Sequence, residues 1–323
     1  MTIKEIAQLA GVSSAAVSRY LNGGYISEEK KEKIKKVIDE TGYRPSIQAR
    51  ILRTKRSRLI GVVVPKISSE SISRVTDGIS QILGEKGYHM LLANTDNQPQ
   101  KELEYMKLFQ NYPVDGIILI ATVLTPRHQQ FLEKSSLPIA VIGQYTEHAS
   151  CIYHDDRGAA KDLGLYVGQK SRREIAYIAV TKDDQAAGAA RENGFCAGLE
   201  LAGRQLSPHC RVEAAFTMES GYQQTCQLLE RNHEIDIISC ATDTIAAGAI
   251  EAIQKNHPER KGKITVTGFG DNQFLKAVTG GIPTVHFAYK TSGIKGAQLI
   301  IDMIEHGHSV PVQIKLGYRL MNL

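Results

Sequence analysis

The sequence predicts an α/β protein with a unit of three helices at its N-terminus and a larger body of two lobes, each built on a parallel β-sheet. Helix-starting residues and glycine stops recur within residues 1–44. Short apolar runs alternate with helical segments over residues 59–323, and basic residues gather before position 59. We therefore divide the chain into a head (residues 1–44), a hinge and linker (residues 45–58) and a body (residues 59–323).

The overall composition is that of a soluble protein. Hydrophobic residues make up 42% of the 323 residues and charged residues 23%, and no apolar run approaches the roughly 18 residues that a membrane-spanning helix needs. The first residues lack the charged and then apolar order of a secretory signal. We therefore expect a cytoplasmic protein that does not associate with a membrane.

The formal net charge of +5 is unevenly distributed along the chain. Residues 1–58 contain 13 Lys and Arg against 6 Asp and Glu, a charge of +7, whereas the remainder has 26 against 28, a charge of −2. A basic N-terminal part on a nearly neutral body is typical of a protein that binds a polyanion such as DNA.

The sequence contains no recognisable metal, cofactor or catalytic motif. Its five cysteines are widely spaced and include no Cys-x-x-Cys pair, which zinc and redox motifs commonly use. Residues 268–273 lack the last glycine of a dinucleotide-binding fingerprint, and neither a Gly-x-Ser-x-Gly nor a His-x-x-x-His motif is present. We therefore expect reduced cysteines, no metal, no cofactor and no enzymatic activity.

The head has the order of a helix-turn-helix. Thr2 and Glu5 have capping-box spacing before a helix predicted over residues 3–10, and Gly11 can adopt the left-handed conformation that ends it. Ser13 can cap a second helix, and a third is expected over residues 28–41.

A helix-turn-helix places its second helix in the DNA major groove. On that helix Arg19 can pair with guanine, Ala15 can touch a thymine methyl group, and Ser14 and Ser18 can bond a base or a phosphate. The alternative is a simple three-helix packing unit in which Arg19 is only a solvated surface residue. The charge of +7 favours DNA binding.

The body alternates strands and helices. Apolar strands that are separated by helices are typical of parallel sheets covered on both faces. In such sheets ligands bind at the carboxyl ends of the strands, so a cleft between two lobes is the expected ligand site. The predicted strands include residues 60–64, 90–93, 116–120, 138–142, 175–180, 235–240 and 264–269.

Four runs of the head and hinge, residues 2–13 (TIKEIAQLAGVS), 16–22 (AVSRYLN), 42–45 (GYRP) and 49–53 (ARILR), resemble the headpiece of the lactose/galactose repressor family. The similarity continues less strictly through the rest of the chain. It implies a periplasmic-binding-protein-like body, a homodimer, double-stranded operator DNA as partner, and a small-molecule effector, a sugar or sugar phosphate. The DNA-contacting positions that the head and the resemblance indicate are Thr2, Ser13, Ser14, Ala15, Ser18, Arg19, Asn22, Tyr43, Ser46, Ala49, Leu52 and Arg53.

Pro45 favours the start of a short hinge helix that ends near Leu52. A helix of about eight residues is marginal in water and needs a partner to be ordered. The resemblance implies that two such helices pair in the minor groove, where Leu52 wedges between base pairs and bends the DNA. The alternative is a disordered basic linker through residues 54–58 in the free protein.

The resemblance also implies effector contacts in the cleft. Arg191 offers donors for paired hydroxyls or an anionic group, and Phe216 offers an aromatic face to a sugar ring. The alternatives are a surface ion pair for Arg191 and a purely structural core position for Phe216. The effector-binding positions implied are Ser69, Ser71, Ile72, Gly143, Gln144, Arg191, Phe216, Thr242, Asp243 and Asp271.

Two positions depart from the pattern of sugar-binding relatives. Many of those relatives have Asn where this chain has Thr242, and an acidic residue where it has Gly270. These departures leave the identity of the effector open. A regulator controlled by a protein partner is the alternative within the family. An enzyme would need motifs that are missing here, and an exported sugar-binding protein would need a signal peptide and no basic head.

Overall fold

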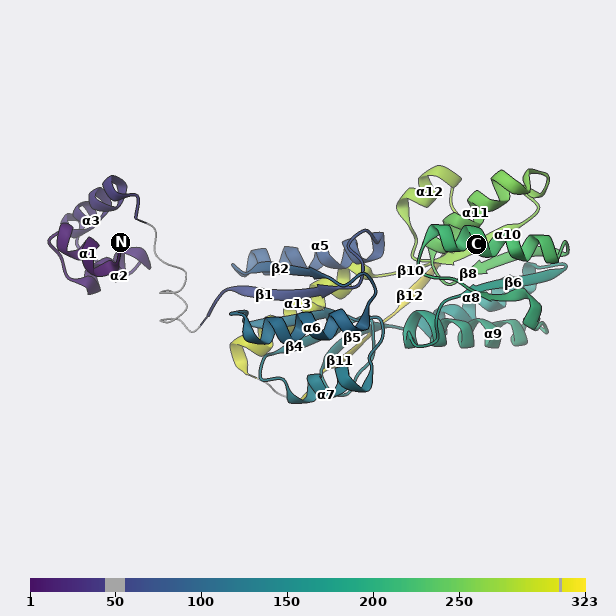
Figure 1. Ribbon diagram of the computed structural model, residues 1–323, viewed down its shortest axis with the longest axis horizontal. Coiled ribbons are helices and arrows are strands. Elements are labelled where there is room, and N and C mark those ends of the chain that lie inside the picture. Colours follow the sequence, from purple (N-terminus) through teal and green to yellow (C-terminus); the bar gives the residue numbers. More distant parts are fainter. Residues whose placement is uncertain (44–55, 308–309) are drawn as a thin grey trace. The chain divides into compact units, whose positions relative to one another are not determined.

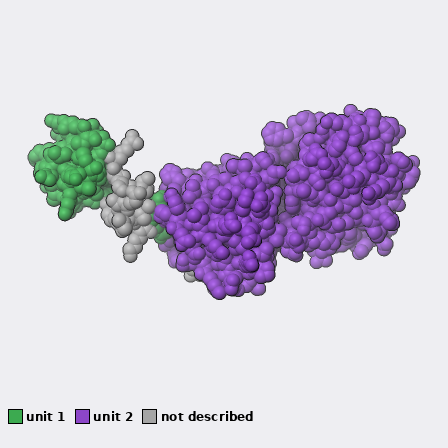
Figure 2. All heavy atoms as spheres, in the orientation of Figure 1, with its two compact units in different colours: residues 1–58 green, residues 59–323 purple. Residues whose placement is uncertain are grey.

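The computed structural model describes residues 1–43, 56–307 and 310–323. The chain forms two compact units, Met1–Arg58 and Leu59–Leu323, which Figure 2 shows in different colours. The predicted hinge helix lies outside the described residues. No helix in the described ranges is both long and apolar enough to cross a membrane, and all five cysteines are free thiols.

The first unit is the expected three-helix head, with α1 (Ile3–Leu9), α2 (Ser14–Leu21) and α3 (Glu28–Thr41). The capping box at Thr2 is formed with both of its hydrogen bonds, and the Ser13 side chain caps α2 by accepting from the backbone of Ala16. Gly11 has a φ of +64°, the left-handed conformation that the tight turn between α1 and α2 requires. Side chains of all three helices pack into one small core.

The first lobe of the body contains a six-stranded sheet in the order β11-β5-β4-β3-β1-β2, in which every neighbouring pair is parallel. Helices α5 and α13 cover one face and α6 and α7 cover the other. The strands are β1 (Leu59–Val64), β2 (His89–Asn94), β3 (Gly116–Ile120), β4 (Ile139–Ile142), β5 (Ser150–His154) and β11 (Gln313–Leu316). The helices are α5 (Glu70–Glu85), α6 (Pro99–Asn111), α7 (Pro126–Lys134) and α13 (Tyr289–His306).

The second lobe repeats this plan with the order β12-β10-β9-β8-β6-β7. Its pairs are parallel except for β10 with the edge strand β12. Helices α8 and α9 pack on one face, and α10, α11 and α12 pack on the other. The strands are β6 (Glu174–Ala179), β7 (Arg211–Glu213), β8 (Ile235–Cys240), β9 (Thr265–Phe269), β10 (Thr284–Phe287) and β12 (Tyr318–Met321). The helices are α8 (Asp156–Lys170), α9 (Arg191–Leu201), α10 (Met218–Arg231), α11 (Asp243–Asn256) and α12 (Gln273–Thr279), with short turns η1 (Gln185–Ala190), η2 (Pro208–Cys210) and η3 (Pro258–Arg260).

The chain passes between the lobes three times, after β5, after β10 and after β11. Figure 1 shows the last two passages in yellow, with α13 returning to lie beside α5. The sequence order of strands and helices does not reveal this return. As a consequence each lobe is completed by residues from the C-terminal end of the chain.

The docking of α13 on α5 depends on two glycines. A Cβ atom at Gly78 would lie 2.2 Å from the carbonyl oxygen of Lys290, and one at Gly293 would lie 2.0 Å from that of Val75. These distances are far below van der Waals contact, so any larger residue would push the helices apart. The C-terminal helix is therefore held tightly against the lobe that precedes it by some 200 residues in sequence.

Candidate functional site

The outer surface of α2 carries the side chains that the sequence predicts to read DNA. Ser14, Ala15 and Arg19 are exposed and Ser18 is half-buried, whereas the opposite side of the helix is buried in the head core. The side-chain amide of Asn22 donates to the backbone carbonyl of Ser18 and so caps the end of this helix. The exposed surface of α2 can therefore enter a groove without unfolding the head.

The remaining predicted DNA-contacting residues occupy different environments. The hydroxyls of Thr2 and Ser13 cap helices, which fixes their positions at the starts of α1 and α2. Tyr43 is half-buried against the head core. The other predicted positions, Ser46, Ala49, Leu52 and Arg53, lie outside the described residues.

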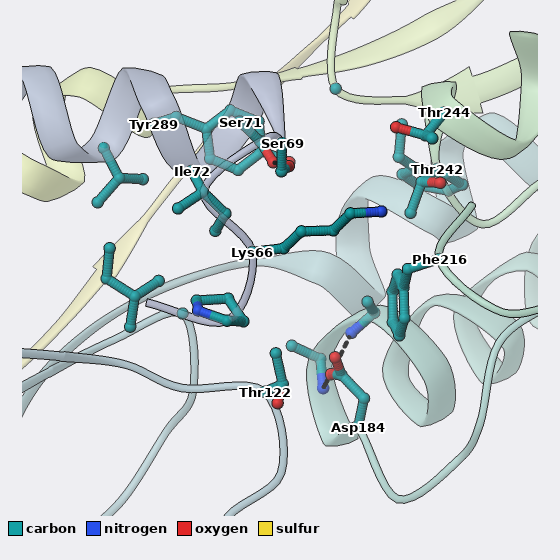
Figure 3. A pocket seen from close by; sticks show the side chains of 18 of the residues that line it. Lys66, Ser69, Ser71, Ile72, Thr122, Asp184, Phe216, Thr242, Thr244 and Tyr289 are labelled. Carbon is teal, nitrogen blue, oxygen red and sulfur yellow. Dashed lines mark hydrogen bonds between the residues drawn. The ribbon is translucent and has the colours of Figure 1, made fainter. Parts of the chain in front are cut away.

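A cavity of about 210 Å³ lies between the two lobes of the body (Figure 3). A single water needs roughly 10–15 Å³ of such space, so the cavity can hold a small organic ligand. It is lined from the first lobe by loops after β1, β3 and β4, and from the second by loops after β6, β7, β8 and β9. It therefore lies at the carboxyl ends of strands in both sheets, as the sequence predicts. All predicted effector residues line it except Asp271.

Arg191 is buried at the start of α9, with 6% of its surface exposed, so it is not the surface ion pair that its position at a helix start suggested. Its Nε donates to Asp156 at 2.8 Å and its Nη1 to the carbonyl of Ala241 at 2.7 Å. The guanidinium carbon lies 4.9 and 5.0 Å from the ring centres of Phe269 and Phe287. Burial opposes the charge of Arg191, but Asp156, together with Tyr289 and Asp184, outweighs this effect and raises the pKa of the guanidinium.

Gln144 connects the two lobes across the cavity. Its amide nitrogen donates to Asp184 of the second lobe at 2.8 Å and to the carbonyl of Thr122 at 2.8 Å. The same Asp184 oxygen accepts from the backbone of Ala186 and Ala187, where the chain enters η1. Burial raises the pKa of Asp184. In Figure 3 Asp184 lies at the edge of the cavity below Phe216.

The two aspartates that follow β8 and β9 both accept or share hydrogen bonds within the second lobe. Asp243 accepts from the backbone of Asn272 and from the Thr284 hydroxyl, and burial raises its pKa to about 6. Asp271 has a φ of +49° and its carboxylate lies 2.8 Å from His286, and the residue is absent from the cavity lining. Asp243 therefore lines the cavity with its carboxylate already engaged, whereas the lining gives the predicted effector contact of Asp271 no support.

The sequence did not predict several of the residues that line the cavity. His154 and Tyr289 sit where the chain passes between the lobes, with ring centres 5.4 Å apart, and Asp156 holds Arg191. Lys66 lies in the loop that follows β1, so the rule that ligands bind after strand ends could have identified it. Tyr289 had no such signal, because the sequence does not reveal that α13 returns to the first lobe.

Comparison with known proteins assigns a class to this arrangement of a helix-turn-helix head and a two-lobed body with a central cavity. A model of bacterial regulatory proteins of the lacI family matches residues 2–46. A model of the periplasmic binding proteins and the sugar binding domain of the LacI family matches residues 57–321. The chain is a DNA-binding transcriptional regulator with a body of the sugar-binding type. It belongs to the LacI family, which confirms the resemblance seen in the sequence.

Individual relatives align with this chain along most of their length. The sucrose operon repressor of Staphylococcus xylosus is 30% identical over 304 residues, which is 94% of either chain. Catabolite control protein A of Priestia megaterium is 28% identical and covers 86% of this chain and 84% of its own. Among solved structures, the Lac repressor bound to ONPG in the repressed state has a TM-score of 0.85 at 20% identity, covering 100% of this chain and 98% of its own. At that identity the likeness shows the fold alone.

Proposed function

We propose that this protein is a cytoplasmic, homodimeric repressor of a carbohydrate-utilisation operon, and that a sugar or sugar phosphate bound between the lobes controls its affinity for the operator. The observation that carries the proposal is a cavity at the carboxyl ends of both sheets that combines hydrogen-bonding side chains with aromatic faces. Names of relatives, such as the sucrose operon repressor, support the carbohydrate class. We assign no catalytic reaction to the protein.

In this proposal each lobe supplies part of the effector site. Phe216 and Tyr289 offer aromatic faces, and Thr242, Gln144 and the two serines after β1 offer hydrogen bonds. Arg191 has five N–H donors, of which one donates to Asp156 and one to the carbonyl of Ala241. The remaining donors are available to a ligand hydroxyl.

The switch needs two arrangements of the lobes to which the effector binds with different affinity. Gln144 with Asp184, and Arg74 with the carbonyl of Gly270 at 3.1 Å, are bonds between the lobes that such a motion would make or break. The first lobe continues directly from the hinge at Leu59. We propose that its rotation separates or joins the two hinge helices of a dimer, in which Leu52 contacts the operator centre.

The test is a thermal-shift screen of the full chain against sugars and sugar phosphates, followed by operator-affinity measurements with each hit. A ligand at 100 times its dissociation constant stabilises by about 2.7 kcal/mol. Stabilisation by a sugar without any protein partner, together with a shift in operator affinity, supports the proposal. Catabolite control protein A among the relatives makes control by a protein partner the second candidate, and operator binding that responds only to such a partner would favour it.

A further inference from the structure

Lys66 extends from the loop after β1 into the cavity, toward the side formed by Phe216 and Thr242 (Figure 3). The side chain is half-buried. Within the described parts of the chain its ammonium group has no hydrogen-bond or ion-pair partner. A partly desolvated ammonium without a counter-ion is unfavourable, so a ligand group that supplies negative charge would gain from contact with it.

The other charged groups of the cavity already have partners inside the protein. Arg191 is paired with Asp156, and Glu70 lies 3.7 Å from Arg74. Asp184 and Asp243 accept hydrogen bonds from the backbone and from side chains. Burial raises the pKa of Glu70, Asp184 and Asp243, and that of Asp243 reaches about 6.

The start of α5 adjoins Lys66 and adds donors for an anion. Ser69 occupies the N-cap position of this 16-residue helix, but its side chain does not cap the helix. Its hydroxyl lies instead 3.0 Å from that of Ser71, and both residues line the cavity. Unsatisfied N–H groups and the helix dipole make such a helix start favourable for negative groups.

A second observation indicates that the cavity is built to hold a ligand. His154 lines it, has only 8% of its surface exposed, and its Nε2 atom has no hydrogen-bond partner. Leaving such a buried polar atom unpaired is unfavourable. Burial lowers the pKa of His154 to about 4, so the ring is neutral near pH 7 and suits a ligand hydroxyl.

We propose that the effector is a phosphorylated sugar whose phosphate group binds Lys66, the Ser69 and Ser71 hydroxyls and the open first turn of α5, while His154 bonds a sugar hydroxyl. This inference rests on the proposed function and specifies the chemical class of its ligand. The four donor groups come from a single segment of the first lobe, residues 66–72, from which Lys66 extends toward the second-lobe side of the cavity.

The test compares the full-length wild type with Lys66→Gln and with Lys107→Gln, which removes an exposed charge of the same lobe away from the cavity. Thermal shifts are measured at constant ionic strength with inorganic phosphate and with matched pairs: glucose and glucose 6-phosphate, fructose and fructose 6-phosphate, sucrose and sucrose 6-phosphate. We expect at least one phosphorylated sugar to bind the wild type more tightly than its neutral form. Lys66→Gln should weaken that binding at least about tenfold, as loss of a charge-assisted hydrogen bond predicts, whereas Lys107→Gln should not.

Phosphate ligands that stabilise Lys66→Gln as much as the wild type would overturn the inference, as would the absence of any Lys66-dependent stabilisation. Lys66→Arg, which keeps the charge, should retain most of the effect. Neutral sugars that stabilise the wild type and Lys66→Gln equally and shift operator affinity would overturn the phosphate site but leave sugar sensing intact. If no sugar of either kind has any effect, the proposed function fails as well.

Discussion

Gln144 of the first lobe and Asp184 of the second are joined by a hydrogen bond of 2.8 Å across the cavity. Both side chains are buried, with 5% and 4% of their surfaces exposed. Since Asp184 also holds the start of η1 through Ala186 and Ala187, this bond connects the loop after β4 to the segment that leads into Arg191. An effector that reaches Gln144 would therefore influence both lobes at once.

Replacing Gln144 with Ala should loosen the two lobes. Asp184 keeps its backbone hydrogen bonds, so the loss in the free energy of unfolding should be about 0.5–1.5 kcal/mol, the usual net value of one hydrogen bond. Operator affinity without effector should change severalfold, because the balance between lobe arrangements shifts. Urea unfolding and operator titration at fixed salt measure both quantities, with the exposed Gln129→Ala as the control. An operator affinity equal to that of the control would show that this bond does not bear on the switch.

Asp243 and His154 should affect stability with opposite pH dependence. The folded pKa of Asp243, about 6, lies above its ordinary 3.8, so the native state holds the proton longer and stability falls as pH rises from about 4 to 6. The folded pKa of His154, about 4, lies below 6.5, so stability rises with pH between about 4 and 6.5. The unfolding free energy of Asp243→Asn should therefore rise more steeply with pH than that of the wild type, and that of His154→Gln less steeply. Urea titrations from pH 4.5 to 7 decide the matter, and parallel pH profiles for all three proteins would contradict it.

Strand order and the strand-end rule predicted the two lobes and most of the cavity, since both depend on local patterns. The sequence could not predict contacts made by residues far apart in the chain. Asp156 is 35 residues from Arg191, and the packing of α8 against α9 brings them together. The contact between Asp271 and His286 was not predicted, because no local pattern indicates a left-handed backbone at a non-glycine residue.

Arg19 should read a base and not merely hold a phosphate, since it is exposed on the outer surface of α2. Arg19→Ala should cost about 1–3 kcal/mol on the true operator and much less on random DNA. Lys35→Ala on α3 is a matched control, because it removes one exposed charge of the head that is not on α2. Equal losses on operator and random DNA for Arg19→Ala would assign it to the phosphate backbone.

A double variant at Arg191 and Asp156 should separate the structural role of Arg191 from its role in effector binding. Arg191→Ala leaves the Asp156 carboxylate, 6% exposed, without its counter-ion, and removing one partner of a buried ion pair typically costs about 3–5 kcal/mol. The single variant should therefore unfold at lower urea concentration and lose the effector response because it is unstable.

The double variant Arg191→Met with Asp156→Asn removes both charges and keeps most of the packing against Phe269 and Phe287, so it should recover most of the lost stability. Without effector, the double variant should bind operator with an affinity within about threefold of wild type. If Arg191 binds the effector, adding effector should no longer change that affinity. Operator titration at one salt concentration, with and without the sugar identified by thermal shift, provides the measurement. A stable double variant that keeps the full wild-type response would show that Arg191 supports the cavity without contacting the effector.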